Sequence, residues 1–126
     1  MHPRKLGAAP LAAMPIMLAA LAGCQPLIGD DCTMNIDCSE DGDRYCDRTQ
    51  PNGYCTIVDC EANSCPQEAI CVQFYDDVHA RSYCLRKCDK DSVCRSSYQC
   101  TEPIPGVSEV IDDSFERKGY CAPRME

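Results

Sequence analysis

The placement of cysteine constrains this chain more than any other feature of its sequence. Thirteen of the 126 residues are cysteine, and short chains with so many cysteines are typically secreted proteins held together by disulfides. Twelve of them form three groups of four that begin at Cys32, Cys60 and Cys88, so the pattern repeats every 28 residues. The later members of the groups are Cys38, Cys46 and Cys55, then Cys65, Cys71 and Cys84, then Cys94, Cys100 and Cys121. This repeat predicts three small disulfide-bonded units.

Apolar residues are too few after residue 23 to form a large core. Leu, Ile, Val and Phe make up about 16 per cent of residues 24–126, below the roughly 20 per cent at which highly charged chains are typically disordered. Each disulfide contributes typically about 2–4 kcal/mol by restricting the unfolded chain. We therefore predict a small disulfide-rich fold with short β-hairpins and little regular secondary structure.

The segment between the third and fourth cysteine of each repeat varies in length and always ends in tyrosine. These tyrosines are Tyr54, Tyr83 and Tyr120. In repeat 1, Gln50-Pro51-Asn52-Gly53 is typical of a turn, because proline presets the backbone and Asn-Gly tolerates positive φ. In repeat 2, residues 72–83 alternate in polarity around Asp76-Asp77, as a hairpin does. In repeat 3 we expect residues 101–120 to form a long loop.

The first 23 residues have the layout of a secretory signal peptide. Arg4 and Lys5 precede an uncharged and mostly apolar stretch that ends in small residues. This stretch is shorter than a membrane-spanning helix and is interrupted by Pro10 and Pro15, which favours cleavage over a retained anchor. Its last residues together with the next, Leu21-Ala22-Gly23-Cys24, resemble the lipobox of bacterial lipoproteins.

The lipobox resemblance implies that Cys24 carries a lipid. In that family the cysteine thiol takes a diacylglyceryl group, the chain is cut before the cysteine, and the new amine is usually acylated. Setting Cys24 aside also leaves an even number of cysteines for disulfides. Residues 24–31 are then expected to form a lipidated tether, and since Gln25 is not an inner-membrane retention aspartate, we expect a lipoprotein of the outer membrane. The alternative is an ordinary secreted protein with Cys24 in a disulfide.

The spacing of the four cysteines resembles known disulfide modules. It is similar to the opening of EGF-like modules, to the N-terminal module of Dickkopf-type proteins and to the repeats of cysteine-rich lipoproteins in myxobacteria. The resemblance implies that the first cysteine pairs with the third and the second with the fourth. We expect three such repeats, at residues 32–59, 60–87 and 88–126, to form a short rod.

Few residues suggest catalysis or a cofactor. His79 is the single histidine after residue 23, and no Cys-x-x-Cys pair occurs, which disfavours zinc and thiol redox chemistry. Residues 37–43 begin like a calcium loop, but Arg48 stands where the bidentate glutamate belongs. We expect no catalytic residue, no metal site and no cofactor, and we keep weak calcium binding by the acidic turns as an alternative.

Charge and loop length limit the expected partners. With 20 acidic against 12 basic residues, the chain lacks the basic excess that nucleic-acid binding requires. We predict a noncatalytic surface binding or adhesion module for an unidentified protein or glycan, with a hydrolase inhibitor or a structural envelope component as alternatives. Long loops on rigid scaffolds often carry binding, and deleting residues 107–116 is expected to preserve the fold. The predicted contact residues are Val110, Ile111, Asp112, Asp113 and Phe115.

Overall fold

The computed structural model describes residues 7, 25–75, 80–113 and 119–125. Repeat 1 contains η2 (Asn35–Asp37), β1 (Tyr45–Cys46) and β2 (Cys55–Thr56). Repeat 2 contains β3 (Ala69–Phe74) and β4 (Ser82–Cys88). Repeat 3 contains η3 (Asp91–Val93), β5 (Tyr98–Thr101), β6 (Ser108–Val110) and β7 (Gly119–Pro123). The predicted small disulfide-rich fold with short strands is confirmed, and none of the helices among the described residues has the length and apolar character needed to cross a bilayer.

All twelve cysteines from Cys32 onward are joined in six disulfides. The pairs are Cys32–Cys46, Cys38–Cys55, Cys60–Cys71, Cys65–Cys84, Cys88–Cys100 and Cys94–Cys121. In every repeat the first cysteine binds the third and the second binds the fourth, which is the pairing that the resemblance implied. Each of the six bridges therefore closes within one repeat.

The three repeats share one arrangement of their third and fourth cysteines. These two residues lie opposite each other on paired antiparallel strands, as Cys46 and Cys55, Cys71 and Cys84, and Cys100 and Cys121. Opposed residues of antiparallel strands project from the same face of the sheet. The two sulfurs therefore point to one side, where the first and second cysteines meet them, and the strand pair and its two bridges form a single unit.

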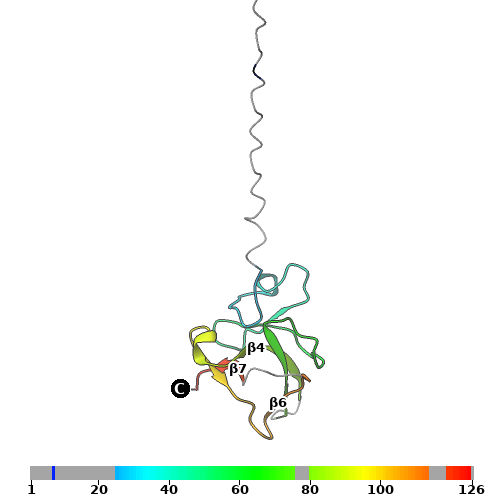
Figure 1. The fold of residues 1–126 in the computed structure, drawn as a ribbon, viewed down its shortest axis with the longest axis vertical. Coiled ribbons are helices and arrows are strands. Elements are labelled where there is room, and N and C mark those ends of the chain that lie inside the picture. The colour runs from blue at the N-terminus through cyan, green and yellow to red at the C-terminus, as the bar shows by residue number, and fades with distance from the viewer. Residues whose placement is uncertain (1–6, 8–24, 76–79, 114–118, 126) are drawn as a thin grey trace, which may run out of the picture.

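Strands of the second and third repeats belong to one sheet. Its five strands follow the order β5-β7-β4-β3-β6, whereas β1 and β2 form a separate pair. Within residues 101–120, which were expected to be a loop, Ser108–Val110 pairs antiparallel with the end of β3 (Figure 1). Ser108 is buried, and deleting residues 107–116 would remove an edge strand of the sheet. The segment is therefore not a plain loop, and we now expect this deletion to disturb the fold.

The repeats pack around a common core, so the prediction of a rod is wrong. The main buried cluster combines side chains of all three repeats. Tyr54 of repeat 1 packs on Tyr98 of repeat 3, with ring centroids 5.4 Å apart. Its hydroxyl accepts a hydrogen bond from the Arg86 backbone N–H at 2.9 Å and donates one to the Cys121 carbonyl at 3.3 Å. Burial raises the pKa of Tyr54 well above its ordinary value.

The opposite face of the large sheet carries a second, smaller cluster. Ile70 and Val72 alternate with core-facing Cys71 along β3, as the period of a strand requires. Tyr120 packs beside them and donates its hydroxyl hydrogen to the Ser108 Oγ at 2.9 Å. The tyrosine before the fourth cysteine is thus a core residue in repeats 1 and 3.

Residues 26–31, which were expected to belong to a free tether, are packed into the fold. Pro26 offers its carbonyl to the Arg44 guanidinium at 2.7 Å, and Ile28 is completely buried in the main core. The backbone N–H of Ile28 donates to a Glu68 carboxylate oxygen at 3.2 Å, and that of Gly29 donates to the Cys55 carbonyl at 2.9 Å. The folded unit therefore begins at Pro26.

Candidate functional site

Several residues singled out in the sequence lie outside the described part of the chain. These are the lipidation candidate Cys24, the predicted contact residue Phe115, and His79. The turn predicted at residues 76–77 lies outside it as well. Their roles stay predictions.

The described apolar members of the predicted binding loop are half-buried. Val110 lies in β6 opposite Val72 and packs against the smaller core cluster. Ile111 packs against the main cluster, and its backbone N–H donates to the Cys71 carbonyl at 3.0 Å. Both residues pack this segment of repeat 3 against repeat 2. Because their side chains are partly buried there, less of their apolar surface is accessible to a partner.

The two aspartates of the predicted loop bind repeat 2 as well. Asp112 accepts the backbone N–H of Asn63 at Oδ1 and that of Cys71 at Oδ2, at 2.7 and 3.2 Å. Asp113 exchanges two hydrogen bonds with the Asn63 side chain, at 2.9 and 3.0 Å. The two aspartates therefore hold this segment of repeat 3 against repeat 2 through hydrogen bonds, beside the apolar contacts of Val110 and Ile111.

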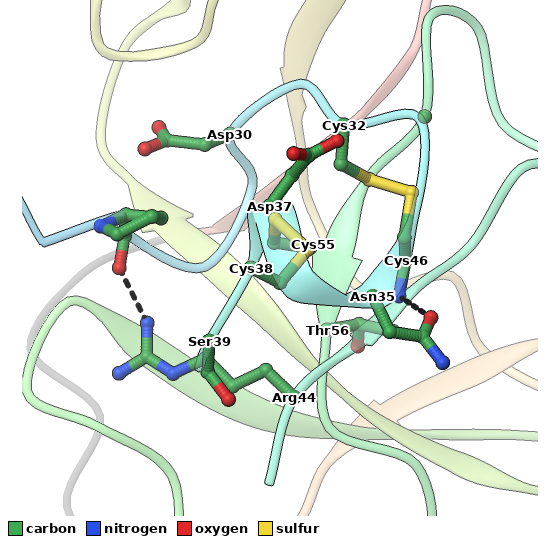
Figure 2. The surroundings of a disulfide bond; sticks show 12 residues. Asp30, Cys32, Asn35, Asp37, Cys38, Ser39, Arg44, Cys46, Cys55 and Thr56 are labelled. Atoms are coloured by element: carbon green, nitrogen blue, oxygen red, sulfur yellow. Dashed lines mark hydrogen bonds between the residues drawn. A yellow bond between two sulfur atoms is a disulfide. The ribbon is translucent and has the colours of Figure 1, made fainter. Parts of the chain in front are cut away.

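Sequence reasoning missed a repeated polar residue that explains this contact. Each repeat has Asn or Asp three residues after its first cysteine, at Asn35, Asn63 and Asp91. In repeats 1 and 3 its Oδ1 accepts the backbone N–H of the third cysteine, at 2.9 Å in both (Figure 2 shows Asn35 and Cys46). In repeat 2 that N–H donates to Asp112 instead. The 28-residue period of these Asx residues was the signal available in the sequence.

Substituting Asp112 tests this interpretation. Asp112→Ala removes the acceptor of two backbone N–H groups, so we expect a loss of about 1–2 kcal/mol in the free energy of unfolding, measured by denaturant titration without reductant. Asp113→Ala is the control, because the Asp113 backbone N–H keeps its bond to Asn63 and only one exposed side-chain bond is lost. An equal effect of both substitutions would contradict the role given to Asp112.

The acidic turn of repeat 1 uses its carboxylates to close local structure. Oδ2 of Asp37 accepts the backbone N–H and the hydroxyl of Thr33, both at 2.9 Å, and the Met34 N–H at 3.1 Å. The hydrogen bonds from Thr33 hold the pKa of Asp37 below its ordinary value. Ser39 donates its hydroxyl to Asp43. Weak calcium binding by this turn stays the alternative to a solvated acidic turn.

Three cysteine sulfurs lie within 4.8 Å of one another in each repeat. They belong to the two neighbouring disulfides of that repeat. Metal binding requires thiolates, and a sulfur in a disulfide is not one. The close grouping therefore follows from the bridges themselves, which Figure 2 shows for repeat 1.

An open groove lies at the junction of repeats 1 and 3. Most of the residues that line it have polar or charged side chains, and they are Asp31, Cys32, Thr33, Asp37, Arg48, Gln50, Asn52, Gly53, Arg95 and Ser96. Arg95 is held in place by the Gly29 carbonyl, which accepts from Nε at 2.8 Å, and by the Gly53 carbonyl. Its guanidinium lies 4.3 Å from the centre of the Tyr98 ring, a cation–π contact. Arg48 is exposed at the same groove.

The groove offers hydrogen-bonding groups of both kinds on a rigid frame. Arg48 is a cationic donor, Asp31 is an acceptor, and amide and hydroxyl side chains line the groove as well. The turns that carry them are fixed by the Cys32–Cys46 bridge and by backbone bonds such as Cys32 N–H to the Asn52 carbonyl at 3.2 Å. Such a surface suits a polyhydroxylated or amide-rich ligand, because each of its groups can bind without reordering the frame.

Comparisons of the chain with protein-family models, with curated proteins and with solved structures gave no match. The structure itself defines the class: a small disulfide-rich protein with six bridges and short antiparallel strands.

Proposed function

We propose that the mature chain is a lipoprotein of the bacterial outer membrane, anchored through Cys24, that serves as a noncatalytic surface binding or adhesion module. The lipobox match at residues 21–24 supports the anchor, and so does the cysteine count, because Cys24 stands apart from the twelve disulfide cysteines. The anchor would consist of two or three acyl chains, which suffice for stable membrane attachment.

The observation that carries the binding role is the open groove between repeats 1 and 3, which polar and charged residues line. Its side chains project from segments that disulfides and Arg95 hold in place. A preorganised surface loses little conformational entropy when it binds a ligand. We propose a glycan or an extended polar peptide as the partner, and we place its contacts in this groove rather than at the β6 segment.

The test combines processing and binding. The full-length protein is expressed and extracted from membranes with detergent. Mass spectrometry is expected to show an N-terminal Cys24 that carries acyl groups. The same material is then applied to arrays of envelope and host glycans and of peptides. We expect a bound ligand whose affinity falls about tenfold or more in Arg48→Ala, the loss of roughly one charged hydrogen bond.

Arg124→Ala is the matched control, because Arg124 is also exposed and does not line the groove. Its affinity is expected to equal that of the unsubstituted chain. An intact Met1 or an unmodified Cys24 would refute the anchor, and equal effects of the two substitutions would refute the groove. Stoichiometric inhibition of a secreted protease would favour the inhibitor alternative instead.

A further inference from the structure

The fold leaves almost no chain between itself and the proposed lipid. Among the described residues, Pro26 is the first held by the fold, through the hydrogen bond between its carbonyl and Arg44. Arg44 is itself held by Glu68, with 3.6 Å between the charged groups and little exposure of either side chain. Only Gln25 separates Cys24 from Pro26, which Arg44 holds. At about 3.3–3.6 Å per extended residue, the lipid-bearing residue reaches roughly 7 Å from Pro26.

Several exposed apolar residues lie in the part of the sequence that follows the proposed anchor. Among the described residues, the large hydrophobic side chains with substantial exposure are Leu27, Met34, Ile36, Tyr45, Tyr75, Ile104 and Met125. Four of these seven fall within the short stretch from residue 25 to residue 46. Exposed apolar residues of this kind, with tyrosine among them, are typical of surfaces that meet the headgroup region of a bilayer.

The charge of repeat 1 indicates which bilayer surface fits. An acidic turn, with Glu40, Asp41 and Asp43, directly precedes Arg44, the residue that binds the Pro26 carbonyl. Anionic headgroups would repel this turn at short range. Zwitterionic headgroups, such as phosphatidylethanolamine, carry no net charge and allow the apolar side chains to reach the boundary with the acyl chains.

We propose that repeat 1 rests directly on the bilayer that carries the anchor, with Leu27, Met34 and Ile36 against a zwitterionic lipid surface. The end of the molecule that carries β6 and the preceding turn then points away from the membrane, since it lies opposite the point where residue 25 enters the fold (Figure 1). This orientation rests on the proposed lipidation of Cys24. The groove between repeats 1 and 3 would then act close to the membrane, within reach of ligands at the envelope surface.

Photocrosslinking to lipid tests the orientation. The photoreactive residue p-benzoylphenylalanine is introduced at Ile36 or at Ile104, two isoleucines of comparable exposure, 61% and 47%. Each full chain is purified with its lipid, checked by mass spectrometry and reconstituted into phosphatidylethanolamine-rich vesicles. We expect lipid adducts at position 36 and none at position 104.

A linker variant completes the experiment. About twelve Gly and Ser residues inserted after Gln25 give the anchor a flexible span of roughly 20 Å, and we expect the adduct at position 36 to be lost. Equal crosslinking at both positions, or an adduct at position 36 that survives the linker, would overturn the proposed orientation while leaving the lipid anchor intact. Absence of lipid on Cys24 would overturn both the anchor and the orientation.

Discussion

Replacing Gly53 with alanine is expected to prevent repeat 1 from folding. A Cβ at this position would lie 2.0 Å from the Cys32 carbonyl oxygen and 2.8 Å from the Cys32 sulfur. Neither atom can retreat, because the sulfur is bonded to Cys46 and the backbone of Cys32 is hydrogen-bonded to Asn52. We expect a loss of more than about 3 kcal/mol in the free energy of unfolding, with free or mispaired Cys32 and Cys46 in a non-reducing peptide map.

Gly42→Ala is the matched control for this substitution. Gly42 has a φ of 76° and Gly53 a φ of 73°, so an alanine at either position has the same unfavourable backbone conformation. A Cβ at Gly42 would meet no atom within 4 Å, and we expect a cost of only about 1 kcal/mol with normal disulfides. Equal effects of the two substitutions would show that backbone conformation, and not the contact with Cys32, makes Gly53 necessary.

The local part of this fold could be predicted because it depends on residues close together in the chain. Asn52 and Gly53 have the positive φ values that their turn sequence indicated, 58° and 73°. The turn sequences of repeats 1 and 2 predicted hairpins, and the strand pairs β1–β2 and β3–β4 are found there. The close approach of Gly53 to Cys32 was not predictable, because it depends on where residues 32 and 53 meet in three dimensions.

The packing of one repeat on another could not be derived from spacing. Arg95 looks like an ordinary surface residue in the sequence, yet it reaches the Gly29 and Gly53 carbonyls across the junction of repeats 3 and 1. Ile28 lies in a segment with proline, glycine and two aspartates, a composition typical of a linker. Its side chain is nevertheless completely buried. One apolar residue in a polar segment gives no periodic signal from which burial can be predicted.

In the third repeat, strand β6 could not be predicted from its own sequence either. Ser108–Val110 has only three residues and follows a Pro-Ile-Pro-Gly turn, so its sequence favours a loop over a strand. Pairing with β3 and the Asp112 bonds to repeat 2 determine its conformation. Among the candidate site residues, the sequence indicated the cysteines correctly as disulfide partners, whereas the groove could not be foreseen because its lining comes from two repeats.

Removing the Cys94–Cys121 bridge is expected to have the second largest effect. This disulfide spans 27 residues, the longest separation of the six, and ties β7 to the segment after η3. In the chain-entropy account its loss costs about 3.6 kcal/mol at 25 °C. Because β7 lies between β5 and β4, loosening it also weakens the junction of repeats 2 and 3. Denaturant unfolding of the Cys94→Ala and Cys121→Ala double variant is expected to show this loss.

The Cys88–Cys100 bridge of the same repeat supplies the comparison. It spans 12 residues, and the same account gives a cost of about 2.8 kcal/mol for the Cys88→Ala and Cys100→Ala double variant. The longer bridge should therefore cost more, and alanine avoids placing a new hydroxyl at buried Cys88 or Cys121. If the shorter bridge proved the more costly one, lost packing around Cys88, which is completely buried, would outweigh loop closure as the source of stability in this repeat.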